Sequence, residues 1–427
     1  MHNLPKEFIE YTSALFGAER WQRFVDSFDE PTPVSIRLNP FKTDSPPALP
    51  VGREPVPWCR NGYWLSERPQ FTLDPLLHAG VYYVQEAGSM FLDEVLRQIK
   101  DTLPTGEGRG GAFLDLCAAP GGKSTLLRAV LAPSLQGGRG ESLLFSNEPD
   151  RKRANILMEN MQKQGHPDVI VTNNYPRDYR KAKMMFDLIL TDVPCSGEGM
   201  FRRDEGAIKE WSIQNVRKCA ELQRSIVEDI WPCLKPGGIL IYSTCTFNVH
   251  EDEENVRWIM EELGADILPI ETKPEWNITG SLLDGWSEPV YRFIPGTSRS
   301  EGLFMAVLQK HGDPDSVHTQ KPTSKQLAGL RVLSDGHPVG EKKGKDIIPA
   351  HAEALSIALD KDKYPMVELS LDDALRYLHR ETLVLPEDTP RGYVIVTYKN
   401  HSLGFMKNLG NRANNLYPKE WYIRHLG

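Results

Sequence analysis

Five short apolar runs between residues 112 and 244 limit most strongly how this chain can fold. Each run leads into a small-residue turn or a helical pattern, and the runs are Ala112–Leu116, Leu143–Glu148, Asp168–Asn173, Phe186–Asp192 and Gly238–Thr244. Strands that alternate with helices form a parallel sheet with helices on its faces. In such a doubly wound, Rossmann-like α/β sheet, ligands bind at the carboxyl ends of the strands. We therefore expect the functional residues to lie directly after these runs.

Two further patterns complete the predicted core. The helix after the second run begins after Asp150, a good N-cap, and ends at Gly165, a good C-terminal stop. Two later apolar runs, Val290–Ile294 and Leu303–Leu308, predict an antiparallel pair at the edge of the sheet.

The chain has 427 residues, more than one ordinary domain holds. Its composition and pattern change along the sequence, which indicates several domains. We expect a mixed N-terminal domain over 1–76 and a catalytic domain over 77–311. A linker rich in Pro, Gly and Lys follows over 312–345, and a small basic domain over 346–427. The net charge of −8 argues mildly against nucleic-acid binding. From residue 391 onward, however, Lys and Arg number six against one acid, so the C-terminal domain suits an RNA partner.

Composition excludes several classes of protein. No apolar run reaches the roughly 18 residues of a membrane-spanning helix, and the first residues lack a secretory pattern, so we expect a cytoplasmic protein. The six cysteines show no Cys-x-x-Cys pair and no nearby histidine cluster, so we expect no metal site. Reduced thiols are the expectation for a chain of this size without an export signal.

The first motif runs from Phe113 to Ser124 and reads FLDLCAAPGGKS. An apolar strand enters a turn of small residues that opens a helix, and Gly121 and Gly122 let backbone amides approach a ligand closely. A phosphate-binding P-loop is one alternative, because Gly-Lys-Ser fits its end, but Cys117 occupies the position of its first glycine. After the second strand, Glu148 offers the carboxylate that a ribose diol requires.

The third and fourth motifs each end a strand in a cysteine. The sequence after Phe186 reads FDLILTDVPCSGEGMF and places Asp192 and then Cys195 at a rigid Pro-Cys bend. The fifth strand ends in Thr244-Cys245. A single cysteine is more often a small core residue than a nucleophile. Two cysteines at the ends of neighbouring strands, with an aspartate between them and the glycine turn, make chance burial the minority interpretation.

These motifs closely resemble those of the RNA cytosine-5 methyltransferase family, which includes bacterial Fmu/Sun proteins and eukaryotic nucleolar NOL/NOP-type enzymes. The three-part layout looks most like the bacterial 16S rRNA methyltransferase branch with a C-terminal PUA-like domain. The similarity extends to Ser35–Pro40, Tyr83–Ala87 and Leu403–Lys419, and so covers nearly the whole chain except 312–345. It implies a Rossmann-like core, a small N-terminal α+β RNA-binding domain and a β-rich PUA-like RNA-binding domain.

The resemblance also implies a cofactor site for S-adenosylmethionine. The residues that would line the donor are Cys117, Ala118, Ala119, Pro120, Gly121, Gly122 and Lys123. Glu148 would hold the ribose, and Asp192 would touch both the cofactor and the target base. The adenine-contacting position, usually Asp in relatives, corresponds to Asn174 here.

In the family's pattern Cys245 is the attacking thiol and Cys195 assists product release. A swap of these roles is the main internal alternative, because DNA cytosine methyltransferases attack from the Pro-Cys position. The implied reaction is methylation of carbon 5 of a cytosine in structured RNA, with 16S rRNA first and tRNA as the alternative. A P-loop NTPase and a non-catalytic ribosome assembly factor are the rival functions. We expect a monomer. Arg202-Arg203, beside the Pro-Cys loop, is a candidate phosphate contact.

Overall fold

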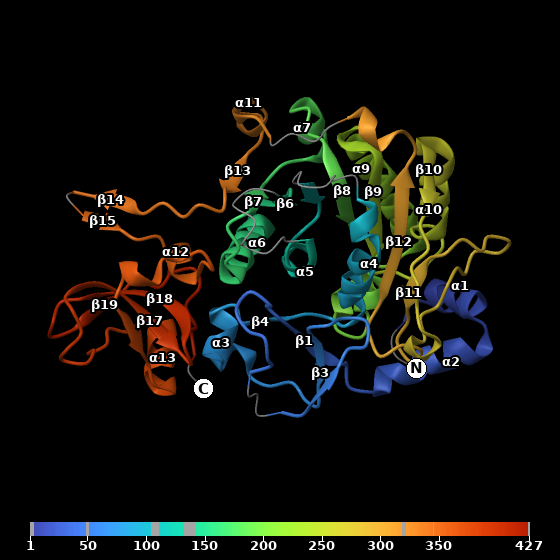
Figure 1. Ribbon diagram of the computed structural model, residues 1–427. Helices are drawn as coiled ribbons and strands as arrows, with labels where there is room; N and C mark the ends of the chain where they lie inside the picture. Colours follow the sequence, from blue (N-terminus) through green and yellow to red (C-terminus); the bar gives the residue numbers. More distant parts are fainter. Residues whose placement is uncertain are drawn as a thin grey trace.

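The computed structural model describes residues 4–47, 51–103, 111–131, 142–317, 322–344 and 346–425. At its centre is a nine-stranded sheet with the order β10-β12-β9-β8-β5-β6-β7-β13, in which β11 also pairs with β12 (Figure 1). The strands are β5 (Ala112–Asp115), β6 (Leu143–Asn147), β7 (Val169–Thr172), β8 (Phe186–Asp192), β9 (Leu234–Thr244), β10 (Ala265–Ile267), β11 (Tyr291–Phe293), β12 (Leu303–Lys310) and β13 (Val332–Ser334).

The five predicted strands are β5 to β9, and they pair in parallel. The predicted antiparallel pair is also confirmed, since β11 and β12 run antiparallel and β12 adds to the edge of β9. From β5 the chain moves outward to β6 and β7 and then returns to β8 and β9 on the other side. In open sheets with such a reversal, ligands bind at the carboxyl ends of the strands beside it.

Helices cover both faces of this sheet (Figure 1). They include α4 (Leu92–Ile99), α5 (Gly122–Leu131), α6 (Arg151–Gln164), α7 (Pro176–Lys181), α8 (Glu205–Glu210), α9 (Ile213–Ile230) and α10 (Glu253–Trp258). The predicted ends of α6 are confirmed: the Asp150 carboxylate accepts the Arg153 amide at 2.8 Å, and Gly165 closes the helix in the left-handed conformation. Leu126 and Leu157 pack on one face, and Val227 and Val256 pack on the other.

The N-terminal part contributes to two regions of the molecule. Its helices, α1 (Lys6–Phe16) and α2 (Ala18–Asp26), bury phenylalanines against Phe201, Trp211 and Phe247 of the central domain. It also forms a four-stranded sheet with the order β2-β3-β1-β4, beside the short helix α3 (Pro75–His78). The strands are β1 (Val34–Leu38), β2 (Arg53–Pro55), β3 (Gly62–Leu65) and β4 (Tyr82–Val84).

The C-terminal part is a second four-stranded sheet with α12 (His351–Leu355) and α13 (Leu371–Leu378). Its strands are β16 (Met366–Glu368), β17 (Gly392–Tyr398), β18 (His401–Asn408) and β19 (Ala413–Asn415). This sheet lies beside the N-terminal one (Figure 1), and the two share a core in which Ile36 and Leu76 join Tyr377, Val394 and Tyr417. The ends of the chain therefore stabilise each other rather than forming isolated appendages.

Two features differ from the expected domain limits, which stay predictions. The N-terminal sheet includes β4, beyond residue 76, because β4 pairs with β1. Within 312–345, α11 (Ser324–Ala328) precedes β13, which pairs with β7 in the central sheet, and β14 (Glu341–Lys343) pairs with β15 (Asp346–Ile348). Residues 318–321 and 345 of this segment lie outside the described residues.

None of the helices in the described part of the chain combines the length and apolarity that a membrane span needs. Within the same residues, no three His, Cys, Asp or Glu side chains gather as metal ligands would.

Candidate active site

The two predicted cysteines meet at the carboxyl ends of neighbouring strands. Strand β8 delivers Asp192 and then Cys195, and the parallel strand β9 delivers Cys245, with Asp192 in register with Ser243. The two Sγ atoms lie 2.9 Å apart, and the Cys245 amide donates to the Cys195 sulfur at 3.4 Å. The fold therefore brings together two thiols that are 50 residues apart in the sequence.

The contact between the thiols affects the protonation of Cys195. The hydrogen bond with Cys245 and burial both raise the pKa of Cys195 well above its ordinary value. Cys195 is therefore a neutral thiol, and either sulfur can be the donor of the hydrogen bond between the two.

Asp192 lies between the glycine turn and the strand that ends at Cys245. Its Oδ2 accepts from Lys123 Nζ at 2.7 Å, and its Oδ1 accepts from Ser243 Oγ at 3.0 Å. Burial alone would lower the pKa of Lys123, but the Asp192 carboxylate outweighs it and raises that pKa. The side chain of Asp192 stays 32% exposed, so the carboxylate is both anchored and accessible. This pairing leaves no free lysine at the position that the P-loop alternative requires.

The predicted cofactor turn has the backbone geometry that its glycines allow. Gly121 has φ +115°, a conformation that other residues rarely adopt, and α5 begins at the next residue. Helix α6 supports the turn, because Arg153 donates to the Ala119 carbonyl at 2.9 Å and Asn160 donates to the Pro120 carbonyl at 2.8 Å. The first amides of α5 have no partner within the helix, so the turn suits a polar or anionic group of a ligand.

Glu148 fits a ribose. It is 1% exposed, and its Oε1 accepts the Asp150 amide at 3.0 Å. Its Oε2 is buried without a hydrogen-bond partner, with the Arg153 guanidinium 3.5 Å away. A buried carboxylate oxygen without a donor is rare in native proteins, and a ribose hydroxyl would supply one. The glycine turn and Glu148 together therefore fit S-adenosylmethionine.

Asn174 differs from the other predicted cofactor residues. Its side-chain oxygen accepts the Arg331 amide at 2.9 Å, and its side-chain nitrogen donates to the Arg331 carbonyl at 3.3 Å. Both polar atoms are thus occupied by the segment that leads into β13. The amide oxygen keeps a second lone pair, so a contact with adenine is compatible with these bonds and stays a prediction.

Two other residues near the turn extend this picture. Asp115, which ends β5, was not singled out from the sequence; Ser124 donates to it at 2.6 Å, and burial raises its pKa to about 7. The feature of the sequence that could have identified Asp115 is its position at the end of the first predicted strand. Cys117 is a neutral thiol, because burial raises its pKa.

Arg202 does not fit its predicted role as a phosphate contact. Its guanidinium pairs with Glu301 at 2.7 Å, and both side chains are almost fully buried. This cation neutralises a protein carboxylate instead of facing an open groove.

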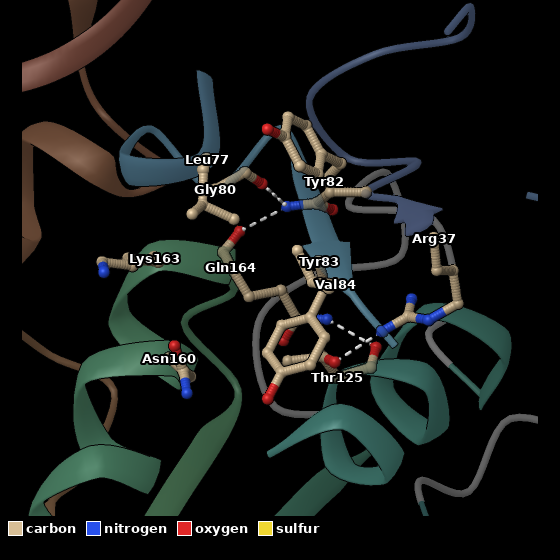
Figure 2. A pocket seen from close by; sticks show the side chains of 11 residues that line it. Arg37, Leu77, Gly80, Tyr82, Tyr83, Val84, Thr125, Asn160, Lys163 and Gln164 are labelled. Carbon is tan, nitrogen blue, oxygen red and sulfur yellow. Dashed lines mark hydrogen bonds between the residues drawn. The ribbon is translucent and has the colours of Figure 1, made fainter. Parts of the chain in front are cut away.

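A cavity of about 230 Å³ lies behind the cofactor turn and not at the thiols. Figure 2 shows Tyr83 from β4 facing Thr125 from α5 and Asn160 from α6. At the edge of this cavity, Arg37 donates to Thr125 Oγ1 at 2.5 Å and to the Gly122 carbonyl at 3.3 Å. The N-terminal sheet thereby contacts the cofactor turn directly through an arginine side chain.

Three family comparisons match successive parts of the chain. The family described as 16S rRNA methyltransferase RsmB/F matches residues 104–309. The N-terminal domain of 16S rRNA methyltransferase RsmF matches residues 4–87, and the methyltransferase RsmF PUA domain matches residues 364–423.

Curated relatives match over most of this chain. Ribosomal RNA small subunit methyltransferase F of Aeromonas hydrophila is 28% identical, over 98% of this chain and 97% of that protein. The protein of the same name from Pectobacterium atrosepticum is 31% identical, over 73% of this chain and 63% of that protein.

Solved structures match the fold. NSun6 from Pyrococcus horikoshii, determined with SFG, aligns with a TM-score of 0.58 and 20% identity and covers 72% of this chain and 99% of that chain. A methyltransferase homolog protein from the same organism aligns with a TM-score of 0.55 and 24% identity, over 72% of this chain and 100% of that chain. The predicted Rossmann-like core with an N-terminal domain and a C-terminal PUA domain is confirmed. The chain belongs to the 16S rRNA methyltransferase RsmB/F family of S-adenosylmethionine-dependent enzymes.

Proposed function

We propose that this enzyme methylates carbon 5 of a cytosine in 16S rRNA through a covalent bond between Cys245 and carbon 6 of the base. The observation that carries the proposal is the 2.9 Å contact between Cys195 and Cys245 beside Asp192. Relatives named as small subunit methyltransferases support rRNA over tRNA as the substrate.

The two thiols answer a specific chemical problem. Carbon 5 of cytosine is a poor nucleophile, so its direct methylation is slow. A thiolate that adds to carbon 6 pushes electron density onto carbon 5 and so activates it, which is covalent catalysis. S-adenosylmethionine supplies an electrophilic methyl group. After transfer, carbon 5 must lose its proton so that the electron pair of that bond restores the ring and the thiolate leaves.

The contact of the pair suits Cys245 as the attacker, the role that the family's pattern implies. A neutral Cys195 thiol 2.9 Å from the Cys245 sulfur can donate to it, and this bond would stabilise negative charge on the attacking sulfur. Once Cys245 has bonded carbon 6, Cys195 lies close to the adduct. As a thiolate, with its own proton lost to water, Cys195 accepts the carbon 5 proton in the elimination that releases the product. Asp192 lies at the same ends of the strands and can bond the base near its ring nitrogen as charge develops there.

The architecture around the site suits structured RNA. A cytosine must leave its stack to reach a pocket at the ends of the strands, at a cost of a few kcal/mol that is smallest in loops and bulges. The C-terminal domain, which matches a PUA family, supplies the basic residues noted above and packs on the N-terminal sheet. Both end domains can therefore hold one RNA against the catalytic core.

Release of hydrogen from carbon 5 tests this function directly. With transcripts that contain [5-³H]cytidine, we expect tritium to enter water one-for-one with methyl groups transferred from S-adenosylmethionine, because methylation replaces the carbon 5 hydrogen. Transcripts of 16S rRNA and of tRNA, assayed in parallel, identify the substrate. Methyl transfer without tritium release would place the methyl group on another atom and reject the proposal.

Replacement of Lys123 by Met is expected to lower kcat on the order of 100-fold, because it frees Asp192 to shift within the site. Single-turnover methyl transfer at saturating cofactor and RNA measures the effect. Lys152→Met, an exposed change in the first turn of α6, is the control. A folded K123M enzyme with the kcat of the control would show that the ion pair has no part in positioning Asp192.

A further inference from the structure

Each of the two loops that carry the thiols places a buried carboxylate against the other loop. Glu198 follows Cys195 by three residues, yet its Oε2 binds the segment after Cys245. It accepts from Thr246 Oγ1 at 2.6 Å, from the Phe247 amide at 2.7 Å and from the Asn248 amide at 3.1 Å. A carboxylate from the first loop thus holds three donors of the second.

Glu251 makes the reverse connection. It follows Cys245 by six residues, and its Oε2 accepts the amide of Ser196, the residue next to Cys195, at 3.0 Å. The same oxygen accepts from Gln223 Nε2 at 2.7 Å, and that nitrogen also donates to the Pro194 carbonyl at 2.9 Å. Glu251 therefore fixes the backbone on both sides of Cys195.

One amide links the two carboxylates. Asn248 Nδ2 donates to Glu198 Oε1 at 3.1 Å and to Glu251 Oε1 at 2.8 Å. Between the loops, the hydroxyls of Ser196 and Thr246 lie 3.1 Å apart. All these contacts are made by residues that closely follow Cys195 or Cys245 in the sequence.

Burial makes this arrangement costly unless it has a use. Glu198 is 1% exposed and Glu251 is fully buried. Removal of a carboxylate from water is expensive and is offset only by complete hydrogen bonding. Burial, together with the charge of Glu198, raises the pKa of Glu251 to about 7. Each acid meets this condition by accepting from several buried donors of the other loop, so its hydrogen bonds fix the position of that loop.

The backbones also approach closely at this point. The Gly199 amide donates to the Cys245 carbonyl at 2.8 Å. A Cβ on residue 199 would lie 2.8 Å from that oxygen and 2.7 Å from the Cα of Gly302, distances that side chains do not tolerate. The two loops therefore meet at a fixed separation, with no space for an intervening side chain.

We propose that Glu198 and Glu251 are positioning residues that set the separation of the Cys195 and Cys245 thiols by crosswise bonds between their loops. We call this pair the carboxylate clasp. The inference rests on the proposed function only for what the thiols do. Neither acid touches the reacting atoms, and each acts through the backbone beside a cysteine.

Glu→Gln variants test the clasp, because both oxygens of each acid accept from donors and an amide NH₂ would oppose one of them. We expect E198Q and E251Q to lower kcat on the order of 100-fold with KM for RNA unchanged, since the thiols move apart. Asp74→Asn is the control, a partly buried acid that caps α3 in the N-terminal part of the chain and whose two oxygens also accept, from the Leu76 amide at 3.0 Å and from the Tyr82 hydroxyl at 2.7 Å.

A second readout follows thiol proximity without methyl transfer. Diamide, a diazene, takes up the two electrons and two protons that Cys195 and Cys245 release when they form a disulfide, and mass spectrometry of unreduced peptides follows its rate. We expect this disulfide to form about tenfold or more slowly in E198Q and E251Q than in the native enzyme and D74N. Thr246→Val removes one donor to Glu198 at similar shape and should show a smaller effect in the same direction.

The outcomes separate the clasp from the proposed function. If folded E198Q, E251Q and T246V form the disulfide at the native rate, or if D74N is equally slow, the clasp is rejected. If the clasp variants are slow to oxidise but the methyl group lies on an atom other than carbon 5, the clasp stands and the proposed function fails. If E198Q and E251Q do not fold, T246V alone decides between these results.

Discussion

Cys245→Ala is expected to lower the rate of methyl transfer by at least about 10⁴-fold, the range seen when an enzyme loses its covalent nucleophile. Without this sulfur nothing adds to carbon 6, and carbon 5 stays unactivated. The cysteine is partly exposed and alanine is smaller, so the fold should tolerate the change. Single-turnover tritium release from [5-³H]cytidine RNA, in the presence of S-adenosylmethionine, measures the loss.

Controls make the C245A result specific. Cys219→Ala, a partly exposed cysteine on α9, should retain native turnover. Binding of S-adenosylmethionine by C245A, measured by titration calorimetry, should match that of the native enzyme, because the predicted cofactor residues follow β5, β6 and β7 or end β8, and none lies on β9. A C245A enzyme that turns over at a native rate would contradict the covalent route through this residue.

Much of the core could be predicted from the sequence because its signals are local. Buried parallel strands are short apolar runs, and the ends of α6 carry a capping Asp150 and a left-handed Gly165. Since parallel strands end at one edge of the sheet, an observer who locates the runs also locates Asp192, Cys195 and Cys245. For this reason the sequence alone predicts that the two cysteines lie close together.

The contacts that tune the site could not be predicted in this way, because they depend on pairing between distant segments. Lys123 and Asp192 are 69 residues apart, and nothing near either one signals that they form an ion pair. Asn174 looks like a free ligand in the sequence, yet the Arg331 backbone, 157 residues away, occupies its side chain. That backbone leads into β13, a three-residue strand with no pattern of its own.

The acids of the clasp illustrate the same limit. Glu198 and Glu251 lie in polar stretches that read as exposed loop, and an acid in a loop is normally solvated. Only the pairing of β8 with β9 brings the two loops together and closes water out. The shared core of the N- and C-terminal sheets is likewise a property of tertiary packing.

Cys195→Ala is the second decisive change, and it should trap a protein–RNA adduct. Attack by Cys245 and methyl transfer do not require the Cys195 sulfur, but the elimination that follows does, so we expect turnover to fall on the order of 100-fold or more. A denaturing gel should then show a slower band that requires S-adenosylmethionine and disappears after ribonuclease treatment. The double variant C195A/C245A should lack that band, because the trapped bond is the one from Cys245 to carbon 6. If instead C245A accumulates the adduct and C195A is inactive without one, the attacking thiol is Cys195. In that case Cys245 is the thiol that donates the hydrogen bond to the attacking sulfur.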